Sequence, residues 1–330
     1  MKPLFAFLAA VLLPGFGTAG EEIAYGLESG TTLLRTFVAD REDSLESIVF
    51  SVDGDEVQEV EEVEDESTSV ERVVVRDEIQ QTEDGFPTDF RRTFVELHQQ
   101  GTRSSGAEES ESVAGSDFED VTVRFLWDDE DERYDVELVE EDDGIDAEEL
   151  ARLTPDLDLA GLLPDGEVDE GDSWEIDHAP YLTLMWPGGL VGWYDDKTED
   201  EASYDYSETI VDNLEGEGEV TFLEVREVDG VRVAVLSVEI RVETGADLEL
   251  SEEEEEAGVE RRADEERELE GEVLWDLDHG HLHSARFEAT LEYTFATRWS
   301  AETPEGDEVE VEQVLHFEGA IVYTAEVERE

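Results

Sequence analysis

Three of the chain's six histidines lie within five residues, at His279, His281 and His283. Imidazole nitrogens bind zinc, and side chains two residues apart on a β-strand point to the same side, so His281 and His283 could hold one ion. His279 lies across the expected turn and could complete the site. An ordinary hairpin turn at His279 and Gly280 explains the same residues, and we favour it. A zinc-dependent enzyme centred on these histidines is the alternative.

The sequence lacks three common catalytic motifs. The patterns G-x-S-x-G, G-x-x-x-x-G-K-[ST] and H-E-x-x-H do not occur. The chain has no cysteine, which excludes disulfides, thiol catalysis and cysteine-based zinc sites. Close pairs of carboxylates arise by chance among 96 acidic residues, so they do not indicate a glycosidase. We therefore expect a protein without catalytic activity and without a required cofactor.

A second candidate site lies between residues 178 and 196, where large apolar side chains are concentrated. The side chains that we select as ligand- or partner-binding residues are Tyr181, Met185, Trp186, Trp193 and Tyr194. A Pro-Gly-Gly sequence at 187–189 interrupts regular structure, and loops that carry aromatic residues often bind ligands. These residues would form a lid or edge that contacts an apolar small molecule or an envelope protein. Burial in the core is the alternative.

The charge of the chain restricts its partners and its habitat. Acidic residues outnumber lysine and arginine by 96 to 21, and the formal net charge is −75 at pH 7. Such a charge repels phosphates, so nucleic acids and anionic membranes are poor partners. In molar salt the screening length falls to about 3 Å, which weakens the repulsion among carboxylates. We therefore expect adaptation to high salt. A further alternative to a binding function is that the chain is a purely structural acidic surface protein.

The N-terminus has the pattern of an export signal. Lys2 precedes an apolar run from Leu4 to Leu13, and small residues follow up to Ala19. The run is shorter than the roughly 20 apolar residues that cross a bilayer, and no later segment is long enough. We expect residues 1–19 to be a signal peptide. The mature protein would then be periplasmic or extracellular, with no transmembrane segment.

Most of the remaining chain alternates apolar and charged residues with period two, which is typical of half-buried antiparallel strands. Asp229-Gly230 between two such runs predicts a tight hairpin turn, and Asp53-Gly54 predicts another. The acidic stretch 128–133 predicts a third hairpin. The sequence therefore predicts a mainly β protein built as a long antiparallel meander, with one or two short helices.

Three segments depart from this alternation. Asp146, with Glu149 three residues later, predicts the start of a helix. Residues 104–116 are rich in serine, glycine and glutamate, which predicts a flexible linker or loop tip. Residues 251–270 are charged throughout and predict a solvated helix or a disordered loop. Because similar hairpins lie on both sides, we interpret residues 20–330 as a single β-rich domain with these two stretches as insertions.

The order of the expected elements resembles the LolA- and LppX-type periplasmic carriers. Early hairpins are followed by a helical interruption near residues 146–163, then by the strand around Trp174 and by further hairpins. The stretch 163–176, LPDGEVDEGDSWEI, is also similar to an element of exported β-rich bacterial proteins. The resemblance implies that the meander forms a curved sheet or half barrel over short helices and carries an apolar ligand. The lipoprotein members carry a lipidated cysteine, which this chain lacks.

These observations together predict a non-catalytic exported binding or envelope-associated protein, adapted to high salt, with an apolar small molecule or a partner protein as its ligand.

Overall fold

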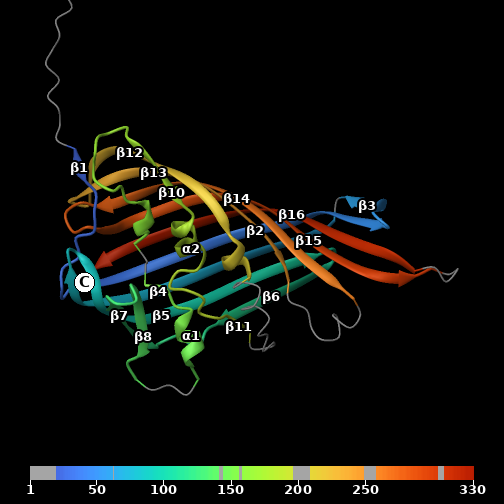
Figure 1. Cartoon of the computed structure of the whole chain (residues 1–330), viewed down its shortest axis with the longest axis horizontal. Helices are drawn as coiled ribbons and strands as arrows, with labels where there is room; N and C mark the ends of the chain where they lie inside the picture. Colours follow the sequence, from blue (N-terminus) through green and yellow to red (C-terminus); the bar gives the residue numbers. More distant parts are fainter. Residues whose placement is uncertain are drawn as a thin grey trace, which may run out of the picture.

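The computed structural model describes residues 20–61, 63–140, 144–155, 158–195, 209–248, 258–303 and 308–330. The predicted signal peptide, residues 1–19, lies outside this part of the chain. Strands dominate the described residues, and short helices lie on one side of them (Figure 1). The predicted fold class, mainly β with a large antiparallel sheet, is confirmed.

The elements follow one another along the chain with long strands at both ends. The strands are β1 Glu21–Glu22, β2 Thr32–Val52, β3 Asp55–Glu61, β4 Asp65–Glu83, β5 Phe86–Ser105, β6 Glu108–Gly115, β7 Thr122–Asp128, β8 Arg133–Leu138, β9 Glu167–Val168, β10 Ser173–Asp177, β11 Tyr194–Asp195, β12 Glu215–Val228, β13 Val231–Asp247, β14 Glu260–Asp276, β15 His281–Glu302 and β16 Glu308–Arg329. The helices are α1 Ala147–Ala151, the 3-10 helix η1 Ala160–Leu162 and α2 Ala179–Met185. None of the described helices has the length and apolar character that crossing a membrane requires.

Fourteen strands form one antiparallel sheet. Its order is β10-β12-β13-β14-β15-β16-β2-β4-β5-β6-β11, with β3 beside β2, β7 beside β5, and β8 beside β7. Most neighbours are consecutive in the chain, as a meander requires. The exception that spans most of the chain is β16, which pairs with β2 over most of their length and so brings the two ends of the described chain together in the middle of the sheet. The sheet is open, because β10 and β11 at its two ends pair with different strands.

The predicted hairpin turns are confirmed. Asp229 and Gly230 have φ angles of 51° and 87°, and they join β12 to β13. Asp53 and Gly54 have φ angles of 50° and 83° between β2 and β3. Two consecutive residues with positive φ form the tight turn whose twist matches that of the flanking strands. The hairpin of β7 and β8 forms around the acidic stretch, as expected.

The two faces of the long strands differ in burial. In β13, Val238, Ile240 and Val242 are buried, whereas Glu239 and Glu243 on the other face are exposed. The helices η1 and α2 lie on the buried face (Figure 1). The longest strands contain 22 residues, which corresponds to about 75 Å at 3.4 Å per residue.

The structure corrects the secondary structure predicted for two segments. Residues 104–116 are not a flexible linker, because β5 continues to Ser105 and pairs with β6 over Glu108–Gly115. Within 251–270, residues 260–270 belong to β14 and are neither helix nor loop, while 251–257 lie outside the described residues. Both predictions relied on polar side chains, but backbone pairing stabilises a strand without an apolar face of its own.

The predicted helix start at Asp146 is confirmed. The Asp146 carboxylate accepts hydrogen bonds from the backbone N–H groups of Glu148 and Glu149, and the Glu149 carboxylate accepts one from the Asp146 N–H. This reciprocal cap satisfies N–H groups that the first turn of a helix leaves unpaired. The helix itself, α1, is only five residues long.

Candidate functional site

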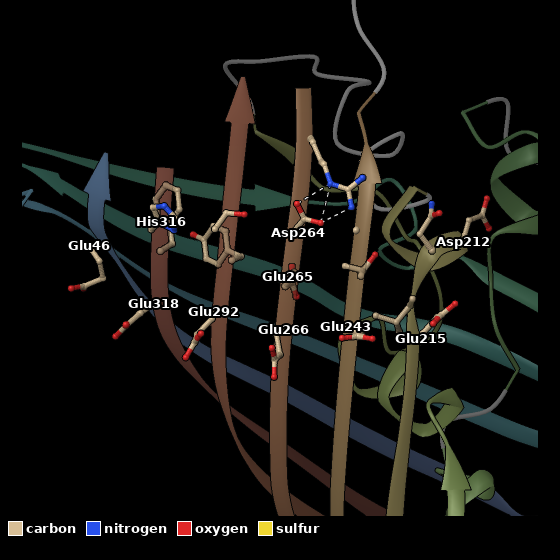
Figure 2. A pocket seen from close by; sticks show the side chains of 18 residues that line it. Glu46, Asp212, Glu215, Glu243, Asp264, Glu265, Glu266, Glu292, His316 and Glu318 are labelled. Atoms are coloured by element: carbon tan, nitrogen blue, oxygen red, sulfur yellow. Dashed lines mark hydrogen bonds and ion pairs between the residues drawn. The ribbon is translucent and has the colours of Figure 1, made fainter. Parts of the chain in front are cut away.

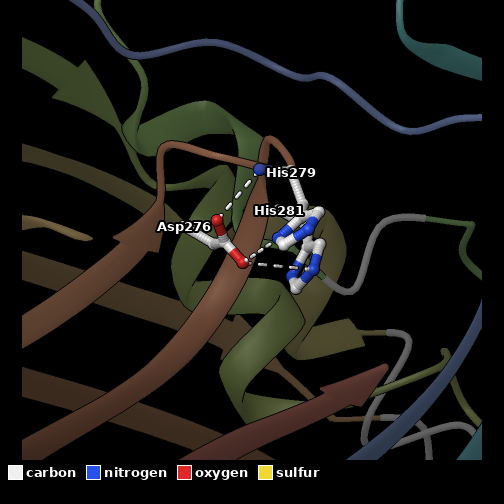
Figure 3. A group of neighbouring side chains, drawn as sticks. All are labelled: Asp276, His279 and His281. Carbon is white, nitrogen blue, oxygen red and sulfur yellow. Dashed lines mark hydrogen bonds and ion pairs between the residues drawn. The ribbon is translucent and has the colours of Figure 1, made fainter. Parts of the chain in front are cut away.

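Asp276, His279 and His281 converge at the end of the hairpin formed by β14 and β15 (Figure 3). Asp276 is the last residue of β14 and lies opposite His281, the first residue of β15. His279 belongs to the turn between them. Its Nδ1 lies 2.7 Å from Asp276 Oδ2, and His281 Nε2 lies 3.7 Å from the same oxygen. One potential ligand atom from each residue lies within 4.8 Å of the others.

Neighbouring backbone groups orient these side chains. Asp276 Oδ1 accepts hydrogen bonds from the N–H groups of Asp278 and His279, at 2.8 and 2.9 Å, so that Oδ2 points toward the imidazoles. His281 Nδ1 lies 2.6 Å from the carbonyl oxygen of Leu282. A carbonyl can only accept, so Nδ1 carries the proton and Nε2 carries the lone pair. His281 is 3% exposed, and its Nε2 has no hydrogen-bond partner among the described residues.

Burial favours the neutral form of His281. Burial lowers its pKa below the ordinary value, against the opposing effects of the bond to Leu282 and of the carboxylates of Asp158 and Asp276. Neutral imidazole is the form that binds metal ions.

His283 does not share a face with His281, contrary to the expectation from strand alternation. Leu282 lies opposite Trp275, and Ser284 lies opposite Leu274, so His283 is the extra residue of a β-bulge. A bulge shifts the alternation of the strand by one residue. Of the three predicted metal ligands, the structure therefore brings His279 and His281 together and leaves His283 out. Asp276 joins them in its place, a residue that the sequence analysis did not select.

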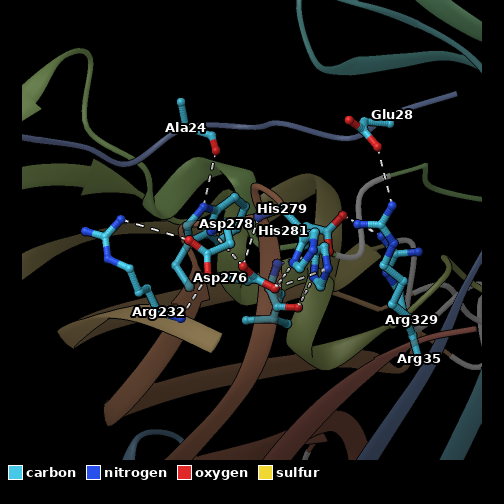
Figure 4. A network of polar contacts seen from close by, with 12 residues as sticks. Ala24, Glu28, Arg35, Arg232, Asp276, Asp278, His279, His281 and Arg329 are labelled. Carbon is cyan, nitrogen blue, oxygen red and sulfur yellow. Dashed lines mark hydrogen bonds and ion pairs between the residues drawn. The ribbon is translucent and has the colours of Figure 1, made fainter. Parts of the chain in front are cut away.

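The segment from Ile23 to Leu27 crosses this hairpin end (Figure 4). The Gly26 N–H donates to the Gly280 carbonyl at 3.0 Å, and the Trp275 indole N–H donates to the Ala24 carbonyl at 3.2 Å. A side chain at Gly280 would place its Cβ 2.1 Å from Gly26 N. Gly280 also has a φ of 64°, which disfavours residues with a Cβ. Glycine is therefore required here for two separate reasons.

We expect Gly280→Ala to destabilise the protein more than Gly54→Ala. Both positions have positive φ, which costs a residue with a Cβ about 1–2 kcal/mol. A Cβ at Gly54 meets open space, whereas one at Gly280 meets the Gly26 backbone and should cost about 1–3 kcal/mol more. Chemical unfolding in molar sodium chloride measures both. Equal losses would show that the crossing segment does not press on the turn.

Four buried charged residues form a connected group that reaches the strand of His281. Asp77 accepts from Arg35 Nη1 at 2.6 Å and from Arg92 Nε at 2.8 Å, and Arg35 Nη2 lies 2.5 Å from Asp158. Arg92 also donates to two backbone carbonyls of the segment before Asp158. Asp158 Oδ1 lies 3.4 Å from the Leu282 N–H, which links this group to the strand of His281. We call these four residues the buried ion group.

Within the buried ion group, Arg35 remains charged despite its burial. Desolvation opposes the charge of Arg35, but the carboxylates of Asp158 and Asp77 outweigh it and raise the pKa of the guanidinium above its usual range. Arg92 is 0% exposed, and its guanidinium lies 5.1 Å from the centre of the Phe125 ring. The two arginines and two aspartates balance in charge, which is the condition under which buried charges are tolerated.

The five predicted apolar binding residues lie in different surroundings. Tyr181 is fully buried in α2, and the Arg267 guanidinium lies 5.6 Å from the centre of its ring. Met185 and Trp193 are half-buried and pack against the core. Trp186 ends α2, and Tyr194 lies in β11. Tyr181 is therefore a core residue, and the segment before the Pro-Gly-Gly sequence is a helix.

Two rows of glutamates cross the exposed face of the sheet, with one glutamate per strand and each directly opposite the next. The first glutamate row runs from β12 to β16 and contains Glu215, Glu243, Glu266, Glu292 and Glu318. The second glutamate row runs from β10 to β15 and contains Glu175, Glu219, Glu239, Glu270 and Glu288. We call this surface the acidic face.

The first glutamate row lines a broad groove of about 780 Å³ (Figure 2). Directly opposite residues of a sheet have Cβ atoms about 4.5–5.5 Å apart, and like charges so placed repel each other. Arg241 lies between the two rows and pairs with Glu266 and Glu268. In the described part of the chain, the other four glutamates of this row form no ion pair. Glu46 extends the row beside Glu318 (Figure 2).

Comparison with known proteins yields only weak similarities. No protein-family model matches the chain, and no curated protein matches it. Among solved structures, the outer membrane protein OprG from Pseudomonas aeruginosa is 9% identical over 91% of this chain and 97% of its own, with a TM-score of 0.16. An outer membrane channel from Pseudomonas putida F1 is 10% identical over 92% and 98%, with a TM-score of 0.23.

A Bacteroides fragilis protein with a YmcC-like fold is 9% identical over 90% of this chain and 98% of its own, with a TM-score of 0.20. Similarities at this level carry no argument about the function of this chain.

Proposed function

We propose that this is an exported, non-catalytic protein of the cell envelope that works in a saline medium and binds cations on its acidic face. Export is supported by the signal pattern of residues 1–19, and a non-catalytic role is supported by the lack of the three catalytic motifs named above. The observation that carries the binding proposal is the first glutamate row, in which carboxylates face one another across five strands.

Cations suit this surface because the chain itself places few positively charged side chains on it. Aligned carboxylates repel one another unless positive charge lies between them, and carboxylate oxygens are the ligands that calcium and magnesium prefer. Arg241 is the one arginine that the described residues place in an ion pair with the first row. Ions from the medium would supply the remaining positive charge, and the groove of about 780 Å³ admits them with their water.

An apolar ligand, as the resemblance to periplasmic carriers implies, has less support. A cavity lined mainly by apolar residues, among them Tyr25, Phe86, Phe90 and Tyr134, measures about 100 Å³. Ligand pockets are usually about 300–1,000 Å³. None of the five predicted apolar binding residues lines this cavity. A lipid-sized molecule would therefore require the protein to open.

Cation binding can be tested with two variants of equal charge. The row variant carries Glu243→Gln, Glu292→Gln and Glu318→Gln. The control, the β6 variant, carries Glu108→Gln, Glu109→Gln and Glu111→Gln, because these exposed glutamates face serine and threonine across β5. We expect the row variant to lose more bound calcium than the β6 variant in equilibrium dialysis at low sodium chloride.

Equal losses in the two variants would attribute binding to net charge alone and would contradict a role for the row. Uptake of a fluorescent fatty acid, measured alongside, distinguishes the carrier function. Stoichiometric uptake by the wild-type protein would favour an apolar ligand over cations.

A further inference from the structure

We propose that Asp276, His279 and His281 form a specific site for a divalent transition metal ion, with zinc as the expected ion. This site is separate from the acidic face and does not depend on the function proposed for it. Two imidazole nitrogens and one carboxylate oxygen are a ligand set that zinc accepts. The three ligand atoms already lie within 4.8 Å of one another.

The strongest observation is the unpartnered nitrogen of His281. The residue is 3% exposed, and its Nε2 lies 3.7 Å from Asp276 Oδ2 with no hydrogen-bond partner in the described part of the chain. Buried polar atoms normally have a partner, so one without a partner calls for a ligand. Because Nδ1 donates to the Leu282 carbonyl, the lone pair of Nε2 points into the cluster. Metal-binding histidines commonly donate their other N–H to a carbonyl in this way.

The turn also orients Asp276 as a metal ligand. Its Oδ1 is occupied by the N–H groups of Asp278 and His279, and its Oδ2 faces both imidazoles (Figure 3). Ligating carboxylates are usually held by such additional hydrogen bonds. The carboxylate also balances part of the charge of a bound ion. Two of the three ligands are therefore oriented by backbone groups before any ion binds.

His279 can adjust its position to complete the site. Zinc binds nitrogen and oxygen at about 2.0–2.2 Å in tetrahedral geometry, which places two ligand atoms about 3.4 Å apart. The present separation of 2.7 Å between His279 Nδ1 and Asp276 Oδ2 must widen by several tenths of an ångström. The His279 side chain lies in the turn and is 38% exposed, so it has room to move. A water molecule from the exposed side would occupy the fourth position.

The site also lies where an ion would secure the crossing N-terminal segment. The Gly280 carbonyl, next to both histidines, accepts from Gly26, and Trp275, next to Asp276, donates to Ala24 (Figure 4). An ion bound by Asp276, His279 and His281 would close the turn that this segment covers. We therefore expect zinc to raise the melting temperature, because an ion that binds the folded state stabilises it.

The test uses full-length protein freed of metal by a chelator and kept in molar sodium chloride with excess magnesium, which occupies carboxylates on the acidic face. Zinc binding is measured by titration calorimetry, and cobalt is added separately to detect imidazole coordination by its visible absorption. We expect one zinc ion per chain. His279→Ala and His281→Ala should each raise the Kd at least about 100-fold, because the loss of an outer partner alone costs about 10–100-fold.

His283→Ala is the matched control, since it removes a histidine of the same hairpin that lies outside the cluster. Its Kd should equal that of the wild-type protein. His279 is partly exposed, so His279→Ala keeps the test valid even if His281→Ala does not fold, which circular dichroism reports. Wild-type protein that binds no zinc would overturn the proposal, and so would equal weakening by His283→Ala.

The row variant separates this site from the acidic face. The row variant should bind zinc with the same affinity as the wild-type protein, but it should bind less calcium. Zinc binding that disappears in the row variant but persists in His279→Ala would show that carboxylates of the acidic face hold the ion, and it would overturn the assignment to Asp276, His279 and His281.

Discussion

Raising sodium chloride from about 0.1 M to the molar range should increase the melting temperature of this protein steeply. The screening length falls from about 10 Å to about 3 Å over this range, which is shorter than the spacing between neighbouring glutamates of the two rows. Two unit charges about 6 Å apart in water repel by roughly 0.7 kcal/mol. The first glutamate row contains four such neighbouring pairs. A melting series against salt measures the effect.

The row variant should be more stable than the wild-type protein at low salt. Glu243→Gln, Glu292→Gln and Glu318→Gln together remove all four repulsive pairs of the first row, so we expect a gain of about 1–3 kcal/mol. The gain should vanish in molar salt. The β6 variant, with the same change in net charge, should gain less, because its glutamates face serine and threonine. Equal gains, or a melting temperature independent of salt, would contradict this explanation.

Asp77→Asn should destabilise the protein by about 3–5 kcal/mol, because it leaves the buried guanidinium groups of Arg35 and Arg92 with too little negative charge. Both arginines donate to this one carboxylate, and all three side chains are 3% exposed or less. The expected loss is a large part of the 5–15 kcal/mol that stabilises a typical protein. Chemical unfolding in molar salt measures it without the repulsion of the acidic face.

Glu272→Gln provides the comparison for Asp77→Asn. Glu272 pairs with Arg226 at 2.7 Å, but both side chains are at least 40% exposed. Exposed ion pairs contribute about 0–1 kcal/mol, so this variant should differ little from the wild-type protein. A loss as large as that of Asp77→Asn would mean that burial does not set the strength of these pairs.

The alternation of apolar and charged residues was sufficient to predict the class of fold. In a strand, side chains point to opposite faces at every second residue, so Val238, Ile240 and Val242 had to share the buried face. The turn at Asp229-Gly230 was equally local, since a tight hairpin requires two residues that accept positive φ. The charge of the chain, and hence the expected response to salt, likewise needed no structure.

The register between strands could not be predicted from the sequence, because register depends on pairings between residues far apart in the chain. The pairing of β16 with β2 joins residues that are between 259 (311 − 52) and 296 (329 − 33) positions apart. The glutamate rows depend on the registers of five strands at once, so alternating glutamates in the sequence could not reveal which of them face one another.

In the histidine cluster, too, the sequence indicated the candidate residues and only the tertiary structure decided which of them come together. The sequence drew attention to His279, His281 and His283, but only the bulge at His283 decided which of them converge. A bulge arises from the fit of one strand against its partner, and it reverses the face of every residue on one side of it. Asp276 belongs to the cluster because the pairing of β14 with β15 places it opposite His281.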